Sequence, residues 1–194
     1  LWMSGGPPHE VAPSILRYPF HPLIYELFTL PMPTIAALPG PAVGLGASLA
    51  LACDIRIASR AGAVGMVFSK LGLVPDGGST FLLRRLVGPA RAMELITSGR
   101  IVPAEECLSL GLVEDVVEPE ALRTVAEERA RALATRSPLA LSLSKALLQG
   151  GEADALAAAM EKEAQAQGQA LQSEEFQSAL KAFKEKRRSP RKGE

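Results

Sequence analysis

The chain has 194 residues, of which 47% are hydrophobic, and its basic and acidic residues balance to a formal net charge of zero. A chain of this length can bury one well-packed core, and a balanced charge argues against a surface built broadly for nucleic acid. It contains no apolar run near the roughly 20 residues that span a bilayer and no signal-peptide pattern, which predicts a cytoplasmic protein without a membrane segment. We expect Cys53 and Cys107, which lie in apolar helical patterns, to be reduced core residues.

The first thirty residues are rich in proline. Residues 1–22 carry five prolines and two glycines, which predicts an irregular segment, with a helix only from Leu23 to Phe28. The two histidines of the chain, His9 and His21, both fall in this segment. We therefore expect them to be surface loop residues rather than catalytic groups.

A strand, a glycine turn and a helix follow one another from Pro33 to Asp54. Residues 34–38 are typical of a short buried strand, residues 39–41 form a turn, and Gly44-Leu45-Gly46 leads into an apolar helix. The first amides of a helix have no acceptor within it and lie at the positive end of its dipole, so this arrangement favours an anion.

Two nucleotide-binding loops are excluded at this turn. A Walker loop would need a lysine between Gly46 and Ser48, where the chain has Ala47, and a dinucleotide fingerprint would need a third glycine where it has Leu49. The glycines could also serve only to let the helix pack closely on the strand. The turn alone leaves these two interpretations open.

Beyond this turn the pattern alternates strands and helices to about residue 135 and is mostly helical afterwards. Asp54–Ala58 alternates like a half-buried strand, and Ser79 or Thr80 is expected to cap the helix after the Pro75–Gly78 turn. Further strands are expected at 64–68 and 113–117, and helices at 79–86, 89–99, 104–110, 120–135, 138–148, 153–171 and 174–187. We expect residues 1–135 to form the core and residues 136–194 a helical C-terminal region.

Five separated blocks carry a resemblance to a known family. They are PTIAA at 33–37, GPAVGLG at 40–46, LALACD at 49–54, GLVPDGG at 72–78 and AEECLSLGLV at 104–113. In order and spacing they resemble the enoyl-CoA hydratase/isomerase family, or crotonase superfamily, over about residues 30–186. The resemblance implies an α/β fold, a crotonase-like spiral of repeated ββα units with a helical C-terminal region. It also implies that some sixty family residues, which supply a second oxyanion amide, precede this segment.

The resemblance implies an acyl-CoA substrate, with coenzyme A as part of that substrate and with no separate cofactor or metal. In the family, the middle amide of the glycine turn holds the thioester oxygen as it becomes an enolate, and here it belongs to Leu45, between Gly44 and Gly46. Family hydratases also use two glutamates, whose positions hold Ser48 and Phe68. Neither side chain is a general acid or base at neutral pH, so we expect both to contact substrate and standard hydration to be absent.

Asp76 is the acid that remains near this site. Its apolar neighbours in the sequence predict partial burial and a raised pKa, suited to accepting and returning a proton. Family isomerases commonly place their acid at this turn. The alternative is that Asp76 only caps the following helix through Thr80. With the phrases FSKLGLVPD at 68–76 and LVGPARAM at 86–93, the pattern is most similar to epoxyphenylacetyl-CoA isomerases, which also move double bonds in enoyl-CoA.

The C-terminal helices match further family features. Phe183 and Lys186 match a Phe-x-x-Lys pair that receives the adenine and phosphate end of coenzyme A, and such helices pack on neighbouring subunits. The resemblance thus implies a homotrimer or homohexamer. Two alternatives stay open: a hydratase with a non-standard acid such as Glu94, and a non-catalytic crotonase-fold binding protein, RNA binding included.

Overall fold

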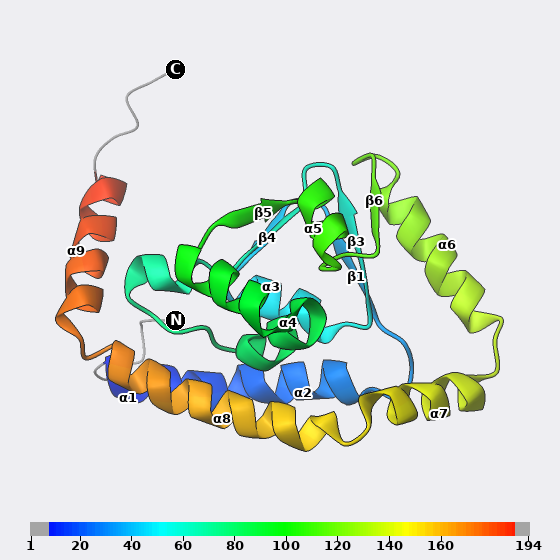
Figure 1. Ribbon diagram of the computed structural model, residues 1–194, viewed down its shortest axis with the longest axis horizontal. Coiled ribbons are helices and arrows are strands. Elements are labelled where there is room, and N and C mark those ends of the chain that lie inside the picture. Colours follow the sequence, from blue (N-terminus) through cyan, green and yellow to red (C-terminus); the bar gives the residue numbers. More distant parts are fainter. Residues whose placement is uncertain (1–7, 189–194) are drawn as a thin grey trace.

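The computed structural model describes residues 8–188, and the side chains of residue 9 and residues 11–182 (Figure 1). Its strands form two three-stranded sheets. One sheet has the order β1 (Ile35–Leu38), β3 (Ile55–Ser59), β6 (Asp115–Val117), and the other β2 (Pro41–Val43), β4 (Ala63–Gly65), β5 (Ile101–Pro103). Of these, β2 and β5 were not expected from the sequence, because three-residue strands give almost no alternating pattern.

The chain passes through both sheets and then a helix, and repeats this path. The first pass is β1, β2 and α3 (Leu45–Ala52), and the second is β3, β4 and α4 (Ser79–Ser98). Because both passes run in the same direction, β1 pairs parallel to β3 and β2 parallel to β4. In the third pass β5 runs antiparallel to β4, and α5 (Ala104–Leu110) leads to β6. The predicted ββα repeat is therefore confirmed.

Strand β3 is more deeply buried than its alternating sequence suggests. Arg56 is only 2% exposed, although it stands at the position expected to face solvent. Its guanidinium donates to the carbonyl oxygens of Leu112 (2.8 Å) and Cys53 (2.5 Å) and to the Glu114 carboxylate. An arginine can be buried when its donors are satisfied in this way, so the prediction of a half-buried strand was wrong.

The proline-rich N-terminal segment is helical rather than irregular. It forms α1 (Pro8–Ile15), a π-helical turn η1 (Leu16–Phe20) and α2 (His21–Thr29). Pro8 and Pro22 fall in the first turns of their helices, where a missing amide hydrogen costs nothing. His21 is 7% exposed, so the expectation of a surface histidine was wrong as well. No local pattern signals this, because the segment is held by packing on a helix far along the chain.

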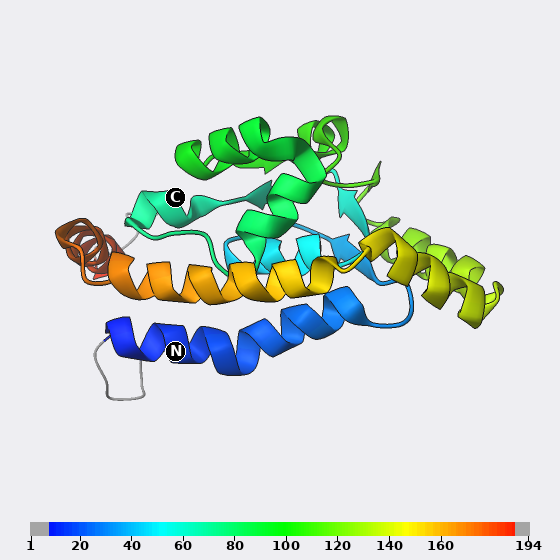
Figure 2. The ribbon, with the colours of Figure 1, turned by 60° about the horizontal axis from the view of Figure 1, so that its bottom comes forward.

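That helix is α8 (Glu152–Ala170), which lies along α1 and α2 and also contacts α4 (Figure 2). Gly168 permits the close approach, since a Cβ there would lie 3.2 Å from Cγ of Pro13. Leu156 and Met160 of α8 belong to the same hydrophobic core as the α3 and α4 side chains.

The other C-terminal helices lie toward the margins of the molecule (Figures 1 and 2). They are α6 (Leu122–Ala134), α7 (Pro138–Gln149) and α9 (Glu174–Arg188). The buried ammonium of Lys145 on α7 donates to Asp54 Oδ2 at 2.8 Å, which fixes α7 to the loop before β3. Cys53 and Cys107 are free thiols, and burial raises the pKa of both. Cys107 lies in the core as predicted, whereas Cys53 is only half-buried, so the prediction of a core residue was wrong for Cys53.

Candidate active site

The glycine turn presents the first backbone amides of α3, which have no acceptor within the helix. Gly44 precedes α3 and has φ 56° and ψ −129°, a backbone conformation that residues other than glycine rarely adopt. Its own amide donates to the carbonyl of Gly65 (2.9 Å), which ties the turn to β4. The next amide, that of Leu45, is the first of α3, where the helix offers no acceptor. The ring of Phe68 packs over this turn, since a Cβ on Gly44 would lie 3.7 Å from it.

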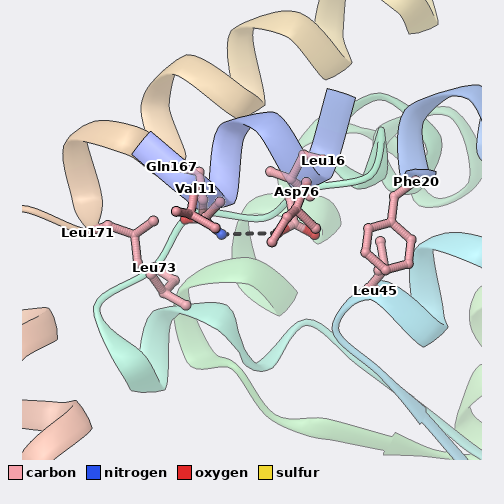
Figure 3. Close-up of a pocket in the computed structure, with 10 residues that line it drawn as sticks. Val11, Leu16, Phe20, Leu45, Leu73, Asp76, Gln167 and Leu171 are labelled. Carbon is pink, nitrogen blue, oxygen red and sulfur yellow. Dashed lines mark hydrogen bonds between the residues drawn. The ribbon is translucent and has the colours of Figure 1, made fainter. Parts of the chain in front are cut away.

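A cavity of about 200 Å³ lies beside the turn (Figure 3). Helix α1 and η1 supply part of its wall through Val11, Ala12, Ile15, Leu16 and Phe20. The rest of the wall consists of Leu45, Leu73, Asp76, Gln167 and Leu171. The lining is thus apolar except for Asp76 and Gln167, two residues that are 91 positions apart in the chain.

Asp76 is buried, and one of its two carboxylate oxygens has no hydrogen-bond partner among the described residues. Its side chain is 8% exposed, and Oδ2 accepts a 3.0 Å hydrogen bond from Nε2 of Gln167. The other oxygen, Oδ1, is buried and has no hydrogen-bond partner among the described residues. Burial raises the pKa of Asp76 from 3.8 to about 6, although the hydrogen bond from Gln167 acts in the opposite direction. The group is therefore mostly ionised at pH 7 and readily protonated.

Ser48 of α3 forms a hydrogen bond with the turn that carries Asp76. The Ser48 side chain is fully buried, and Oγ donates to the backbone carbonyl of Asp76 at 2.9 Å. The adjacent Gly77 has φ 65°, and a Cβ there would lie 2.8 Å from side-chain carbons of Ile24 and Leu45. Close packing on these residues fixes the position of Asp76 relative to α3. Neither Ser48 nor Phe68 lies among the residues that line the cavity.

The amides at the start of α4 are bound by Glu163, a residue of α8. Its carboxylate accepts from the amides of Gly78 (2.6 Å) and Thr80 (2.8 Å) and from the Thr80 hydroxyl. Gly78 is the N-cap and no side chain of the turn caps the helix, so the predicted cap at Ser79 or Thr80 was wrong. The alternative role of Asp76 as a cap through Thr80 is also excluded, because no side chain of the turn caps α4 and the Asp76 carboxylate binds Gln167 instead.

Glu163 and Gln167 are absent from the residues predicted for this site. Glu163 is 4% exposed, and burial is the largest cause that raises its pKa to about 6, with the Asp76 charge contributing in the same direction. The available signal was their spacing: two polar residues four apart on the apolar face that carries Leu156 and Met160. The predicted coenzyme A residues Phe183 and Lys186 belong to α9, and their side chains lie outside the described residues.

Residues 9–194 match a family model described as enoyl-CoA hydratase/isomerase. The chain belongs to this family. It is 40% identical over 182 residues to the 1,2-epoxyphenylacetyl-CoA isomerase of Escherichia coli, an alignment that covers 94% of this chain and 69% of the relative. It is also 38% identical over 190 residues to the mitochondrial methylglutaconyl-CoA hydratase of Rattus norvegicus, covering 95% of this chain and 59% of the relative.

The fold is that of the crotonase superfamily, as the resemblance implied. The crystal structure of an enoyl-CoA hydratase from Mycobacterium avium subsp. paratuberculosis superposes with a TM-score of 0.83 at 31% identity, covering 89% of this chain and 70% of that one. This chain spans only 59% to 69% of the length of the two curated relatives named above. No helix in the part of the chain that the structure describes combines the length and apolarity needed to cross a membrane.

Proposed function

We propose that the chain is the catalytic core of an acyl-CoA isomerase in which Asp76 moves one proton on the substrate. The observation that carries this proposal is a buried carboxyl group with a pKa near 6, in the wall of an apolar cavity that also includes Leu45. A group whose pKa lies close to the working pH can both accept and return a proton within one cycle.

The proposed reaction uses the Leu45 amide and the Asp76 carboxylate together. With the thioester oxygen at the amide, Asp76 removes a proton from the carbon next to the thioester carbonyl, and the electrons of that C–H bond move onto the carbonyl oxygen to give an enolate. The enolate oxygen is stabilised by the amide and by the positive end of α3. With a 3-enoyl-CoA, Asp76 then returns the proton to a different carbon, so the double bond shifts without net oxidation and without consuming water. With an epoxyphenylacetyl-CoA, the carbon–carbon bond of the epoxide also breaks, which opens the ring to the oxepin.

The lining of the cavity favours a hydrocarbon acyl group. A cavity of about 150 Å³ with apolar walls can hold a benzene molecule. The cavity beside Asp76, at about 200 Å³, therefore has room for a ring or a short acyl chain. The similarity to the E. coli 1,2-epoxyphenylacetyl-CoA isomerase supports the same choice. We propose a 3-enoyl-CoA or an epoxyphenylacetyl-CoA as the substrate.

Hydration is the second candidate, because the rat relative is a methylglutaconyl-CoA hydratase and because Glu163 is a second buried acid. The carboxylate of Glu163, however, already accepts three hydrogen bonds from the start of α4. Glu94 is bound to Arg100 at 2.7 Å, which lowers the pKa of the glutamate, and it does not line the cavity. Neither acid is placed to activate water, so isomerisation is the favoured reaction.

We further propose that Phe183 and Lys186 bind the adenine and phosphate end of coenzyme A, and that the protein is a cytoplasmic homotrimer or homohexamer. Support for assembly comes from α7, where Leu139, Leu143 and two further leucines are between 55% and 82% exposed. Contiguous apolar surface of this kind marks interaction sites.

One assay panel tests the reaction. We expect turnover of a 3-enoyl-CoA or of epoxyphenylacetyl-CoA and negligible hydration of crotonyl-CoA. Robust hydration of crotonyl-CoA would favour the hydratase instead. Calorimetry with acetyl-CoA and a longer acyl-CoA tests binding separately. If neither acyl-CoA bound, the proposal of an acyl-CoA enzyme would be refuted. A non-catalytic crotonase-fold protein that binds another partner would then be the better hypothesis.

A further inference from the structure

Gln167, a residue of α8, forms hydrogen bonds with the residues on both sides of Pro75. The backbone amide of Val74 donates to Oε1 of Gln167 at 3.2 Å. Nε2 of Gln167 donates to Oδ2 of Asp76 at 3.0 Å (Figure 3). The glutamine is 4% exposed, so these bonds are shielded from water. Pro75, which lies between the two residues that Gln167 holds, limits the freedom of the backbone further.

The orientation of the Gln167 amide is fixed by its partners. A backbone N–H can only donate, so the oxygen of the side-chain amide must face Val74. Its NH₂ group must then face Asp76. As a result, Oδ2 of Asp76 meets a hydrogen-bond donor whether the carboxyl group is ionised or neutral.

This arrangement distinguishes the two oxygens of Asp76. A proton on Oδ2 would point at the N–H of Gln167, whereas Oδ1 has no partner among the described residues. We propose that Gln167 is a positioning residue that keeps Oδ2 as an acceptor and thereby directs the transferred proton to Oδ1. The proposal deepens the function proposed above and rests on the acid/base role of Asp76.

Few other charges act on this carboxyl group. Glu163 lies one helical turn before Gln167 on α8 and interacts electrostatically with Asp76, but its hydrogen bonds go to the α4 turn. The cavity residues from α1, η1 and α3 are apolar. His21 on α2 interacts with Arg17 and Glu161. Within the described side chains, Gln167 is therefore the one that donates a hydrogen bond to the Asp76 carboxylate.

The test replaces Gln167 with methionine, which has a similar shape and cannot make either hydrogen bond. Gln165→Met is the matched control, because Gln165 lies on the same helix, is exposed and donates to Glu161, away from Asp76. Carboxyl ¹³C NMR, with the Asp76 signal assigned by Asp76→Asn, gives the titration midpoint of Asp76 in each protein. We expect the midpoint to rise by about one pH unit in Gln167→Met and to stay unchanged in the control.

A second readout is the pH profile of kcat/KM for isomerisation. Its acidic limb is expected to move upward by the same amount, so that Gln167→Met loses more activity at pH 6 than at pH 9. If Gln167→Met does not fold, Gln167→Glu serves instead. It keeps an acceptor for Val74 and places a second carboxyl group against Asp76, which also raises the midpoint.

The outcomes separate this inference from the proposed function. A lower kcat with an unchanged midpoint would mean that Gln167 only supports the fold, and the inference would be overturned. A shifted midpoint in a protein that turns over none of the panel substrates would support the positioning of Asp76 by Gln167 while refuting the isomerase.

Discussion

Replacement of Asp76 with asparagine is expected to separate catalysis from stability. Asparagine keeps the shape of the side chain and an oxygen that accepts from Gln167, but it cannot carry a proton at neutral pH. A positioned acid or base typically contributes about 10²–10⁴-fold to the rate. We expect kcat for isomerisation to fall by a factor of that order while affinity for acyl-CoA changes little, because the carboxylate acts on the transition state.

The same substitution is expected to stabilise the protein at alkaline pH. The pKa of Asp76 is raised from 3.8 to about 6 in the folded protein, mainly by burial. The folded state binds this proton more tightly than the unfolded state does, so the bound proton stabilises the fold. This stabilisation is complete below about pH 3.8 and is lost as the pH rises through about 6. About two units at about 1.4 kcal/mol each correspond to roughly 3 kcal/mol at pH 8. Asparagine does not titrate, so the variant does not lose this stability at high pH. Glu163, whose pKa is also raised to about 6, loses stability with rising pH in both proteins.

Urea denaturation at pH 5 and pH 8, together with isomerase rates, would measure both effects. Asp76→Asn is expected to exceed the wild type in free energy of unfolding at pH 8 by about 2–3 kcal/mol, and by less at pH 5, where the wild-type carboxyl group is largely protonated. Equal stability of the two proteins at pH 8 would refute the raised pKa. An unchanged rate would refute the role of Asp76 as the proton carrier.

Three further substitutions test the supports of the site. Gly77→Ala places a methyl group 2.8 Å from side-chain carbons on α2 and α3 at φ 65°, and is expected to cost about 1–3 kcal/mol in chemical denaturation and to lower kcat. Gly168→Leu should force α1 away from α8, because a Cβ there already lies 3.2 Å from Pro13, and KM for acyl-CoA should rise with little change in kcat. Ser48→Ala leaves the buried carbonyl of Asp76 without the hydroxyl donor, and thermal unfolding should show a loss of about 1–3 kcal/mol.

Local physical chemistry made several element boundaries of the core predictable. Gly44, Gly99 and Gly111 all have positive φ and stand where α3 begins and where α4 and α5 end, so the glycines in the sequence mark these boundaries. The strand before the turn, the apolar helix after it and the α5 helix were all expected close to their observed positions. Each of these features depends on residues a few positions apart.

The N-terminal helices depend on contacts that no local pattern contains. Five prolines predicted an irregular segment, but residues 8–29 are helical because they pack on α8, about 150 residues further along the chain. The burial of His21 follows from the same packing. The wall of the cavity that α1 and η1 provide was therefore beyond prediction from composition and spacing.

The sequence by itself determined the family, through the order and spacing of five motif blocks, and that resemblance implied the ββα spiral and the Leu45 amide and Asp76 as candidate chemical groups. Only the tertiary structure decided what surrounds Asp76. Gln167 and Glu163 lie 91 and 87 positions from it in the chain, and they reach its turn because α8 packs across α1 and α4. The apolar neighbours of Asp76 in the sequence already predicted partial burial and a raised pKa, and the packing of these elements raises that pKa to about 6. The partners that hold the carboxyl group are a property of packing rather than of sequence spacing.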